Sequence, residues 1–329
     1  MRPARFILLL LILFAVNCFA QTSATPATDP KLPFQLKLIG PNVWAAIDNA
    51  NGGAGANAGF VIGDDGVAVI DTFENEAAAK ALLHEIHLLT HLPVKFVINT
   101  HYHLDHVAGN RVFDQQGAVI IGHQRIRTWI YSENLKFFGD AIKPEAKAMV
   151  ANLLAPEVTY DAGVTLYLGS RRLDVQFFEG HTGGDSVVLV RDAGIVFCGD
   201  LFWHKTLPNL IDASTAEWIS TLSRIADLAT DAVPGHGGSA PGIFVPGHGV
   251  VGNAADLKDF QTYLTNLRAM VQKPAQSGLK GDDLVAAVLP ELTKQYGSWD
   301  FFKDFSRSDI LDTGAELAGT KRFPPREKK

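Results

Sequence analysis

Short apolar runs separated by polar, glycine-containing turns occur in both halves of the chain. Short runs rich in β-branched and aromatic residues and bounded by Gly, Asp or Asn are typical of buried strands. The pattern predicts strands at residues 43–47, 60–62, 67–70, 94–98 and 118–121 of the first half, and at residues 164–168, 173–178, 186–190 and 195–197 of the second half.

Segments with helical spacing of their apolar residues follow the strands of each half. Such spacing places the apolar side chains on one face and predicts amphipathic helices. Strands followed by helices in a chain of 329 residues favour one large α/β domain over two small ones. The expected helices cover residues 74–89, 124–155, 215–228, 256–271 and 282–296.

The N-terminal residues have the composition of an export signal. Basic residues after Met1 precede an apolar run at residues 6–16, and the small residues Cys18 and Ala20 stand before polar Gln21. This order predicts a secretory signal peptide that is cleaved after Ala20.

The domain organisation expected from this reading is a signal peptide at residues 1–20, a flexible linker at residues 21–34 and a folded domain at residues 35–329. Ala, Thr and Pro dominate the linker. A cleaved signal implies a periplasmic or secreted protein with no stable membrane span. An uncleaved anchor and a lipid on Cys18 stay open as alternatives. Cleavage would leave Cys198 as the remaining cysteine, without an intramolecular disulfide partner.

Acidic residues outnumber basic ones by 35 to 29, which gives a formal net charge of −6. The chain has no long basic run that would neutralise phosphates, and this argues against a nucleic-acid partner. The oligomeric state stays open.

The segment Asn-Thr-His-Tyr-His-Leu-Asp-His-Val-Ala-Gly-Asn, which begins at Asn99, concentrates metal-ligand side chains. It follows a predicted strand, and positions i and i+2 of a strand face one side, so His101 and His103 project together. A bend after them brings Asp105 and His106 back toward the same point. Imidazoles and a carboxylate suit zinc, so the segment predicts one zinc site and a second beside it.

A polar loop with three solvated histidines is the alternative to a metal site, but the strand leading into the motif argues against it. His84, His87 and His91 lie on or near the helix expected at residues 74–89. Their spacing mimics a metal pair, yet no third ligand type accompanies them. We interpret them as surface or packing histidines.

His-Tyr-His-Leu-Asp-His resembles the His-x-His-x-Asp-His signature of the metallo-β-lactamase superfamily, and the resemblance extends from about Asn42 to about Leu267. It implies an α/β fold (α+β in some schemes), the four-layer αββα sandwich. It also implies a metallo-hydrolase that holds two zinc ions and acts on a small-molecule substrate.

The resemblance identifies further ligands outside this motif. His181 stands in the Gly-rich segment Gly-His-Thr-Gly-Gly-Asp, which supplies the third histidine of the first metal in the family. Asp200, expected in a loop after the strand at residues 195–197, resembles the aspartate that bridges the metals in the glyoxalase II-like branch. The implied set is His101, His103 and His181 on one zinc, Asp105, His106 and His248 on the other, and Asp200 with a water between them.

Val-Pro-Gly-His-Gly occurs twice, so His236 and His248 compete for the last position. We predict His248, because apolar residues precede it and a helix capped by Asn253 follows it, whereas the segment after His236 is rich in glycine. An anchored loop holds an imidazole in place better than a flexible one. The rival assignment to His236 stays open.

A hydroxide bridging two zinc ions needs no serine or cysteine nucleophile. Asp105 would orient that hydroxide as the catalytic carboxylate. Asp71, at the end of its predicted strand, is a candidate partner for one ligand imidazole.

The expected function is an exported dizinc metallo-hydrolase that cleaves an ester, thioester, lactone or amide. β-Lactamases of the superfamily usually have Cys or Ser in place of Asp200, which disfavours β-lactam hydrolysis without excluding it. Glyoxalase II enzymes share the aspartate, but we identify no C-terminal set of basic and aromatic residues for glutathione. The alternative is a persulfide dioxygenase-like oxidoreductase, with one iron held by two histidines and an aspartate.

Overall fold

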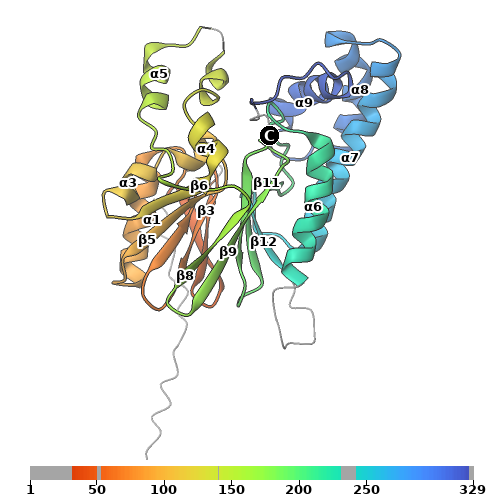
Figure 1. Ribbon diagram of the computed structural model, residues 1–329. Coiled ribbons are helices and arrows are strands. Elements are labelled where there is room, and N and C mark those ends of the chain that lie inside the picture. Colours follow the sequence, from red (N-terminus) through yellow and green to blue (C-terminus); the bar gives the residue numbers. More distant parts are fainter. Residues whose placement is uncertain (1–31, 50–52, 140, 231–241, 326–329) are drawn as a thin grey trace, which may run out of the picture.

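The computed structural model describes residues 32–49, 53–139, 141–230 and 242–325. Within them, two sheets lie face to face and helices cover both outer sides (Figure 1), so the expected αββα arrangement is confirmed. No helix in this described part is both long and apolar enough to cross a membrane. The predicted signal peptide, most of the predicted linker and His236 lie outside the described residues.

The first sheet contains seven strands in sequence order, antiparallel from β1 to β4 and parallel from β4 to β7. Because the parallel strands end at one rim of the sheet, the segments that follow them start there. The strands are β1 (Phe34–Gly40), β2 (Val43–Asp48), β3 (Ala58–Ile62), β4 (Val67–Ile70), β5 (Val94–Asn99), β6 (Val119–His123) and β7 (Val158–Tyr160).

The second sheet has the order β12-β11-β10-β9-β8, and only its β11–β12 pair is parallel among the described strands. The chain thus reaches the same rim again at the ends of β11 and β12. The strands are β8 (Gly163–Leu168), β9 (Arg171–Phe178), β10 (Asp185–Val190), β11 (Ile195–Trp203) and β12 (Ile243–His248).

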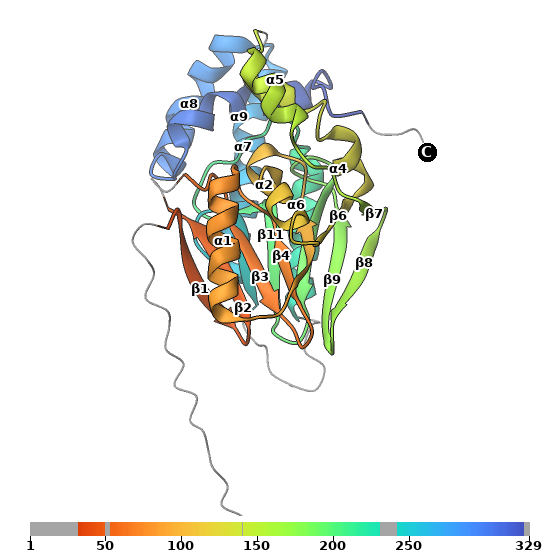
Figure 2. The same cartoon turned by 90° about the vertical axis from the view of Figure 1, so that its left-hand side faces the viewer.

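The helices form the two outer layers (Figure 1), and Figure 2 looks onto the layer outside the first sheet. On the side of the first sheet lie α1 (Glu76–Leu89), α2 (Leu104–Val107), α3 (Asn110–Asp114), α4 (Gln124–Trp129), the 3₁₀ helix η1 (Asn134–Phe138) and α5 (Pro144–Ala151). The second sheet is covered by α6 (Thr215–Thr230), α7 (Ala254–Gln276), α8 (Gly281–Tyr296) and α9 (Phe302–Leu317).

Both sheets are buried on both faces, which explains why their strands are nearly continuous apolar runs. In β11, Val196 packs in the core shared with the C-terminal helices, and Phe197 packs in the core between the sheets. A separate core lies between the first sheet and α1, where Val97 meets Leu82 and Ile86. These three cores hold the strand ends at the rim in fixed positions.

Two expectations about helices and termini are wrong. The helix expected at residues 124–155 is three short helices, because Gly139 adopts a φ of 69° and Pro144 starts a new helix at its first position. Phe34, expected as the last linker residue, is the first residue of β1, and its buried ring stacks on Phe73 at 5.1 Å. Neither β1 nor α9 was predicted.

The loop expected after residues 195–197 is also wrong, because Asp200 lies within strand β11. β11 continues to Trp203, but its register against β12 shifts around Gly199, whose φ is 49°. A Cβ at Gly199 would lie 2.3 Å from Thr100 Oγ1, so only glycine fits there. The irregularity ends the strand's side-chain alternation. Cys198, two residues before Asp200, packs in the core beneath the C-terminal helices.

Candidate metal centre

All the ligand residues expected from the sequence lie together at one rim of the sandwich. Each is buried except Asp105, whose side chain is 28% exposed. They are His101 and His103 in the turn after β5, Asp105 and His106 in helix α2, His181 in the β9–β10 turn, Asp200 in β11 and His248 at the end of β12.

The potential ligand atoms fall into two neighbouring groups. Within each group they all lie within 4.8 Å of one another, close enough to converge on one ion. The first group is His101, His103, His181 and Asp200, and the second is Asp105, His106 and His248. These are the two sets that the resemblance implied.

Asp200 lies between the groups, and each of its carboxylate oxygens faces one of them. Oδ2 is 3.2 Å from His181 Nε2 and 3.7 Å from His101 Nε2. Oδ1 is 3.1 Å from His106 Nε2 and 3.5 Å from His248 Nε2. The backbone fixes this carboxylate closely, since a Cβ at Gly247 would lie 1.8 Å from Oδ1.

The polar atoms at the centre are ones that a cation would satisfy. Among the described residues, His101 Nε2, His106 Nε2, His248 Nε2 and Asp200 Oδ1 are buried without a hydrogen-bond partner. A buried polar atom left unpaired costs about 1–3 kcal/mol, so several converging on one point are expected only where a ligand binds them. Imidazole nitrogens and carboxylate oxygens fit zinc and other divalent transition metals.

The electrostatics of the centre favour positive charge. Burial raises the pKa of Asp200, but the surrounding imidazoles, with His106 and His248 foremost, hold it well below the usual range. Burial lowers the pKa of His106, but Asp200, Asp105 and Asp71 raise it well above its usual value. Burial and its histidine neighbours keep the pKa of His101 well below normal, so its imidazole is a neutral donor.

Asp71 makes the contact expected from the sequence, to a ligand imidazole. His106 Nδ1 lies 2.8 Å from Asp71 Oδ2, which directs Nε2 at the centre. The Thr100 backbone N–H and hydroxyl donate to the same carboxylate at 2.8 and 2.7 Å. Asp71 adopts a φ of 57°, an uncommon conformation for a residue other than glycine.

Asp212 supports His103 in a similar way, and the sequence analysis missed it. Its Oδ2 is 3.3 Å from His103 Nε2, while His103 Nδ1 lies 3.0 Å from His181 Nε2. Tyr102 donates a short hydrogen bond to Asp212, and Lys136 forms an ion pair with it. Burial raises the pKa of Asp212, but His103 and Lys136 bring it below the usual range. Asp212 lies between β11 and α6 in a segment without a motif, so no sequence pattern marked it.

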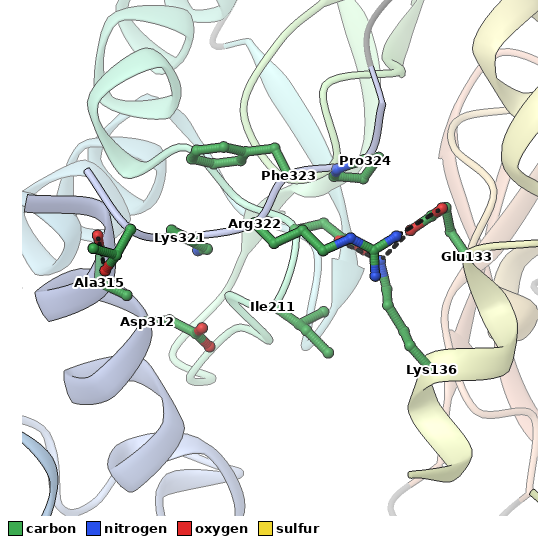
Figure 3. Close-up of a pocket in the computed structure, with 11 residues that line it drawn as sticks. Glu133, Lys136, Ile211, Asp312, Ala315, Lys321, Arg322, Phe323 and Pro324 are labelled. Atoms are coloured by element: carbon green, nitrogen blue, oxygen red, sulfur yellow. Dashed lines mark hydrogen bonds and ion pairs between the residues drawn. The ribbon is translucent and has the colours of Figure 1, made fainter. Parts of the chain in front are cut away.

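Asp212 also lines a second cavity of about 330 Å³, which Figure 3 shows. Charged residues of both signs line it, and Figure 3 shows Lys136 and Arg322 meeting at Glu133. The C-terminal segment that carries Arg322 thus contacts the helix-rich region around η1. Lys136 belongs to this cavity and to the support of His103.

The cavity over the metal-ligand residues also measures about 330 Å³, within the size range of small-molecule sites. Asp105, Asp200, His103 and His248 reach it from the rim of the sandwich. Its walls come from η1, β11 and the segment around the start of α9, and they include Phe137, Phe138, Trp203, Phe301 and Phe305.

His248 occupies the position that the sequence assigned to it. Its Nε2 is 3.2 Å from Asp105 Oδ2, and its ring stacks on Trp203 with 4.0 Å between ring centroids. Asn253 caps α7 immediately after it, as expected from the sequence. His236, the rival, lies outside the described residues.

Comparison with known proteins gives one family match. The family model of the Metallo-beta-lactamase superfamily matches residues 51–237, more than half of the chain. This range ends within the first Val-Pro-Gly-His-Gly segment, whereas the structure brings the histidine of the second segment to the centre.

Curated relatives include two proteins named hydroxyacylglutathione hydrolase. The one from Erythrobacter litoralis is 24% identical over 181 residues, covering 54% of this chain and 61% of the relative. The one from Synechococcus sp. is 26% identical over 170 residues, covering 50% and 56%. This chain thus spans about three-fifths of the length of the relatives it matches.

Solved structures with the same fold include a metallo-beta-lactamase from Pontibacter korlensis, at 23% identity and a TM-score of 0.55, which covers 71% of this chain and 99% of that one. The DIM-1 metallo-beta-lactamase has 18% identity and a TM-score of 0.56, with 71% and 97% covered. At these identities the likeness establishes the fold alone.

Proposed function

Since this chain belongs to the metallo-beta-lactamase superfamily, we propose that it is an exported hydrolase that uses two zinc ions to cleave an ester, thioester, lactone or amide. Export rests on the expected signal peptide at residues 1–20 and implies a periplasmic or secreted enzyme. Membership of this metallo-hydrolase superfamily and the cluster of His and Asp side chains hold whether or not the protein is exported or binds two zinc ions.

The observation that carries the two-ion proposal is the position of Asp200. Its two oxygens face different ligand groups, so one carboxylate is able to contact two cations. One group would be His101, His103 and His181, and the other Asp105, His106 and His248. A single iron held by two histidines and an aspartate, the alternative reading, would leave the rest of this buried donor set without a role.

Zinc bound there would lower the pKa of water toward neutrality and polarise a carbonyl group, which supplies a nucleophile and stabilises the developing oxyanion. The chain's own part is to position the reactants. Asp105, the most exposed carboxylate of the set, faces the cavity with its Oδ2 held 3.2 Å from His248 Nε2. It is placed to accept a hydrogen bond from the attacking water and to orient it, which makes Asp105 the proposed catalytic carboxylate.

The printed names of the similar proteins point to two substrate types. Hydroxyacylglutathione hydrolases cleave thioesters by name, and they are the curated relatives. Metallo-beta-lactamases share the fold at lower identity. Asp200 stands where β-lactamases usually have Cys or Ser, so we favour an ester or thioester over a β-lactam.

Elemental analysis of the purified protein tests the metal part of this proposal. Two zinc ions per chain are expected. One iron per chain, together with oxygen consumption on a persulfide, would support the oxidoreductase alternative instead.

A substrate panel tests the reaction. A chromogenic cephalosporin, a neutral aryl ester, a lactone and a glutathione thioester should be compared on zinc-loaded protein, with zinc-free protein as the control. Hydrolysis of an ester, thioester or lactone that disappears on chelation is expected. Failure of every substrate would contradict the hydrolase proposal.

A further inference from the structure

Large aromatic side chains line much of the cavity over the metal-ligand residues. Five of its thirteen lining residues are large aromatics: Phe137, Phe138, Trp203, Phe301 and Phe305. Phe137 and Phe301 are 36% and 43% exposed, although such side chains are usually buried. Exposed aromatics that gather around one cavity are typical of a surface that binds an apolar ligand group.

Phe301 is also held in a strained conformation. Its φ is 56°, a left-handed value that is an outlier for a bulky side chain. Its ring centroid lies 6.0 Å from that of His248 and 5.8 Å from that of Phe305. Such strain persists where the surrounding structure imposes it, and here it keeps an aromatic wall beside a metal-ligand histidine.

The charge of the lining is one-sided. The charged groups that reach the cavity besides the histidines are Glu74, Asp105 and Asp200, and none of the thirteen lining residues is Lys or Arg. Glu74 lies outside the two ligand groups, next to Gly55. A carboxylate on the substrate, away from the reacting carbonyl and the ligand groups, would therefore meet aromatic rings, Glu74 and the neutral Asn209, with no cationic side chain to pair with. Desolvating a carboxylate without a partner is strongly unfavourable.

The lysine adjacent to this wall in the sequence does not supply the missing cation. Lys136 precedes Phe137, but its Nζ pairs with Asp212 and Glu133 and lines the second cavity (Figure 3). Lysine and arginine side chains thus line the second cavity, whereas none lines the cavity over the metal-ligand residues.

We propose, resting on the hydrolytic function proposed above, that the substrate carries an uncharged, apolar group beside its scissile ester, thioester or lactone bond. The aromatic wall binds this group, and Glu74 disfavours anionic analogues. We therefore expect compounds with several carboxylates, such as glutathione thioesters, to be poor substrates.

Two esters that differ only at the end of the acyl chain test the proposal on the zinc-loaded protein. 4-Nitrophenyl hexanoate ends in a methyl group, and the mono-4-nitrophenyl ester of adipic acid ends in a carboxylate, with the same leaving group. We expect kcat/KM to be about 100-fold higher for the hexanoate, because the unpaired carboxylate must be desolvated. Equal values, or a preference for the adipate ester, would overturn the proposal.

A binding experiment separates failure of this inference from failure of the hydrolase proposal. Hexanamide and adipamic acid carry the same two chain ends without a labile ester, and a calorimetric titration of the zinc-loaded protein measures their binding. Hexanamide should bind at least about tenfold more tightly. Tighter adipamate binding overturns the inference whether or not any ester is cleaved. Tighter hexanamide binding without hydrolysis of any ester supports the inference and contradicts only the proposed hydrolase activity.

Two variants assign the preference to the named residues. Glu74→Gln should lower the hexanoate-to-adipate ratio about fivefold, whereas Glu157→Gln, an exposed acid outside the cavity lining, should leave the ratio as it is. Phe301→Ala should lower the ratio of hexanoate to acetate ester hydrolysis about tenfold. Tyr167→Ala, an aromatic 57% exposed on β8, is the matched control. Unchanged ratios in both site variants would contradict the assignment.

Discussion

Asp200 at the rim of the sandwich and Asp309 among the C-terminal helices are both buried, and their surroundings act on the carboxyl charge in opposite ways. Asp200 at the rim is surrounded by imidazoles, which keep its pKa well below the usual range despite its burial. Asp309 on α9 accepts one short hydrogen bond from Tyr263 of α7, and burial raises its pKa well above the usual range. Both side chains are almost inaccessible to solvent, at 3% and 0% exposure.

The difference between these regions shows what keeps a buried carboxyl group ionised in a metal site and neutral in a helical core. Burial alone drives a carboxyl group toward its neutral form, as at Asp309. Several converging donors are needed to keep it ionised, and Asp200 has them from both sheets. Asp200 is therefore arranged for charge, and Asp309 for packing and one hydrogen bond. Each of the following changes tests one side of this contrast.

The largest effect is expected from Asp200→Asn, which keeps the shape of the side chain and removes its charge. Both ligand groups face this carboxylate, so we expect loss of at least one metal equivalent and a drop in kcat/KM on the order of a thousandfold. Elemental analysis and steady-state kinetics measure the two outcomes. Asp309→Asn serves as the control for removing a buried charge and should keep its metal. Full metal content and activity in Asp200→Asn would remove Asp200 from the centre.

His248→Ala and His236→Ala test which duplicated histidine pairs with Asp200. His248 Nε2 lies 3.5 Å from Asp200 Oδ1, so its removal should lose one metal equivalent and lower kcat/KM on the order of a hundredfold or more. His236→Ala should retain both metals and activity. The reverse pattern in the same two measurements would give the ligand position to His236.

Asp212→Asn tests a third aspartate, which acts through His103 and not on a metal. Its carboxylate accepts from Tyr102 and pairs with Lys136, so the amide should orient His103 less firmly and weaken zinc binding about 10–100-fold. Competition with a chromophoric chelator measures the affinity. The absorption spectrum of the cobalt-substituted variant should also change, because the ligand imidazole shifts, and a purely structural role would leave that spectrum as it is. Unaltered affinity and spectrum would reject the role.

The smallest effect is expected from Asp309→Asn, which should stabilise the protein, whereas the preceding substitutions around the metal centre should weaken metal binding or activity. A carboxyl group whose pKa is raised by folding contributes most below its unfolded pKa of about 3.9, and that contribution is lost as pH rises toward the folded value. Asparagine does not titrate and still accepts from Tyr263. The variant should therefore be more stable than the parent near pH 8, by about 1 kcal/mol or a few degrees in Tm. Thermal unfolding at pH 5 and pH 8 checks it, and a gain that is larger at pH 5 would contradict it.

Much of the centre could be predicted because its signals are local in the sequence. The His-Tyr-His-Leu-Asp-His segment directly follows a clear strand, so its four ligand residues needed only strand geometry and one bend. His181 and His248 stand in short glycine-containing segments beside apolar strands. For these residues, the chain neighbours that position the side chain are also the ones that mark it.

The parts that could not be predicted depend on contacts between distant segments. Asp212 acquires its role from Tyr102 and Lys136, which are remote in sequence and follow no period. The path of β11 through Gly199 is set by the approach of Thr100 from the other sheet, so the apolar run seemed to end early. α9 is largely polar, and it became a helix against α7 and α8 without a clear apolar stripe of its own.

The close approach of Gly247 to Asp200 also bears on how this protein can change over evolution. A Cβ at Gly247 would lie 1.8 Å from Asp200 Oδ1, and a Cβ at Gly199 would collide with Thr100. Single substitutions at either glycine are therefore expected to be selected against. Phe137 lies in η1 and Phe301 directly precedes α9, both outside the sheets, where replacement leaves that backbone framework intact. Lineages of this chain can therefore diversify by exchanging the aromatic wall while inheriting the same metal-binding rim.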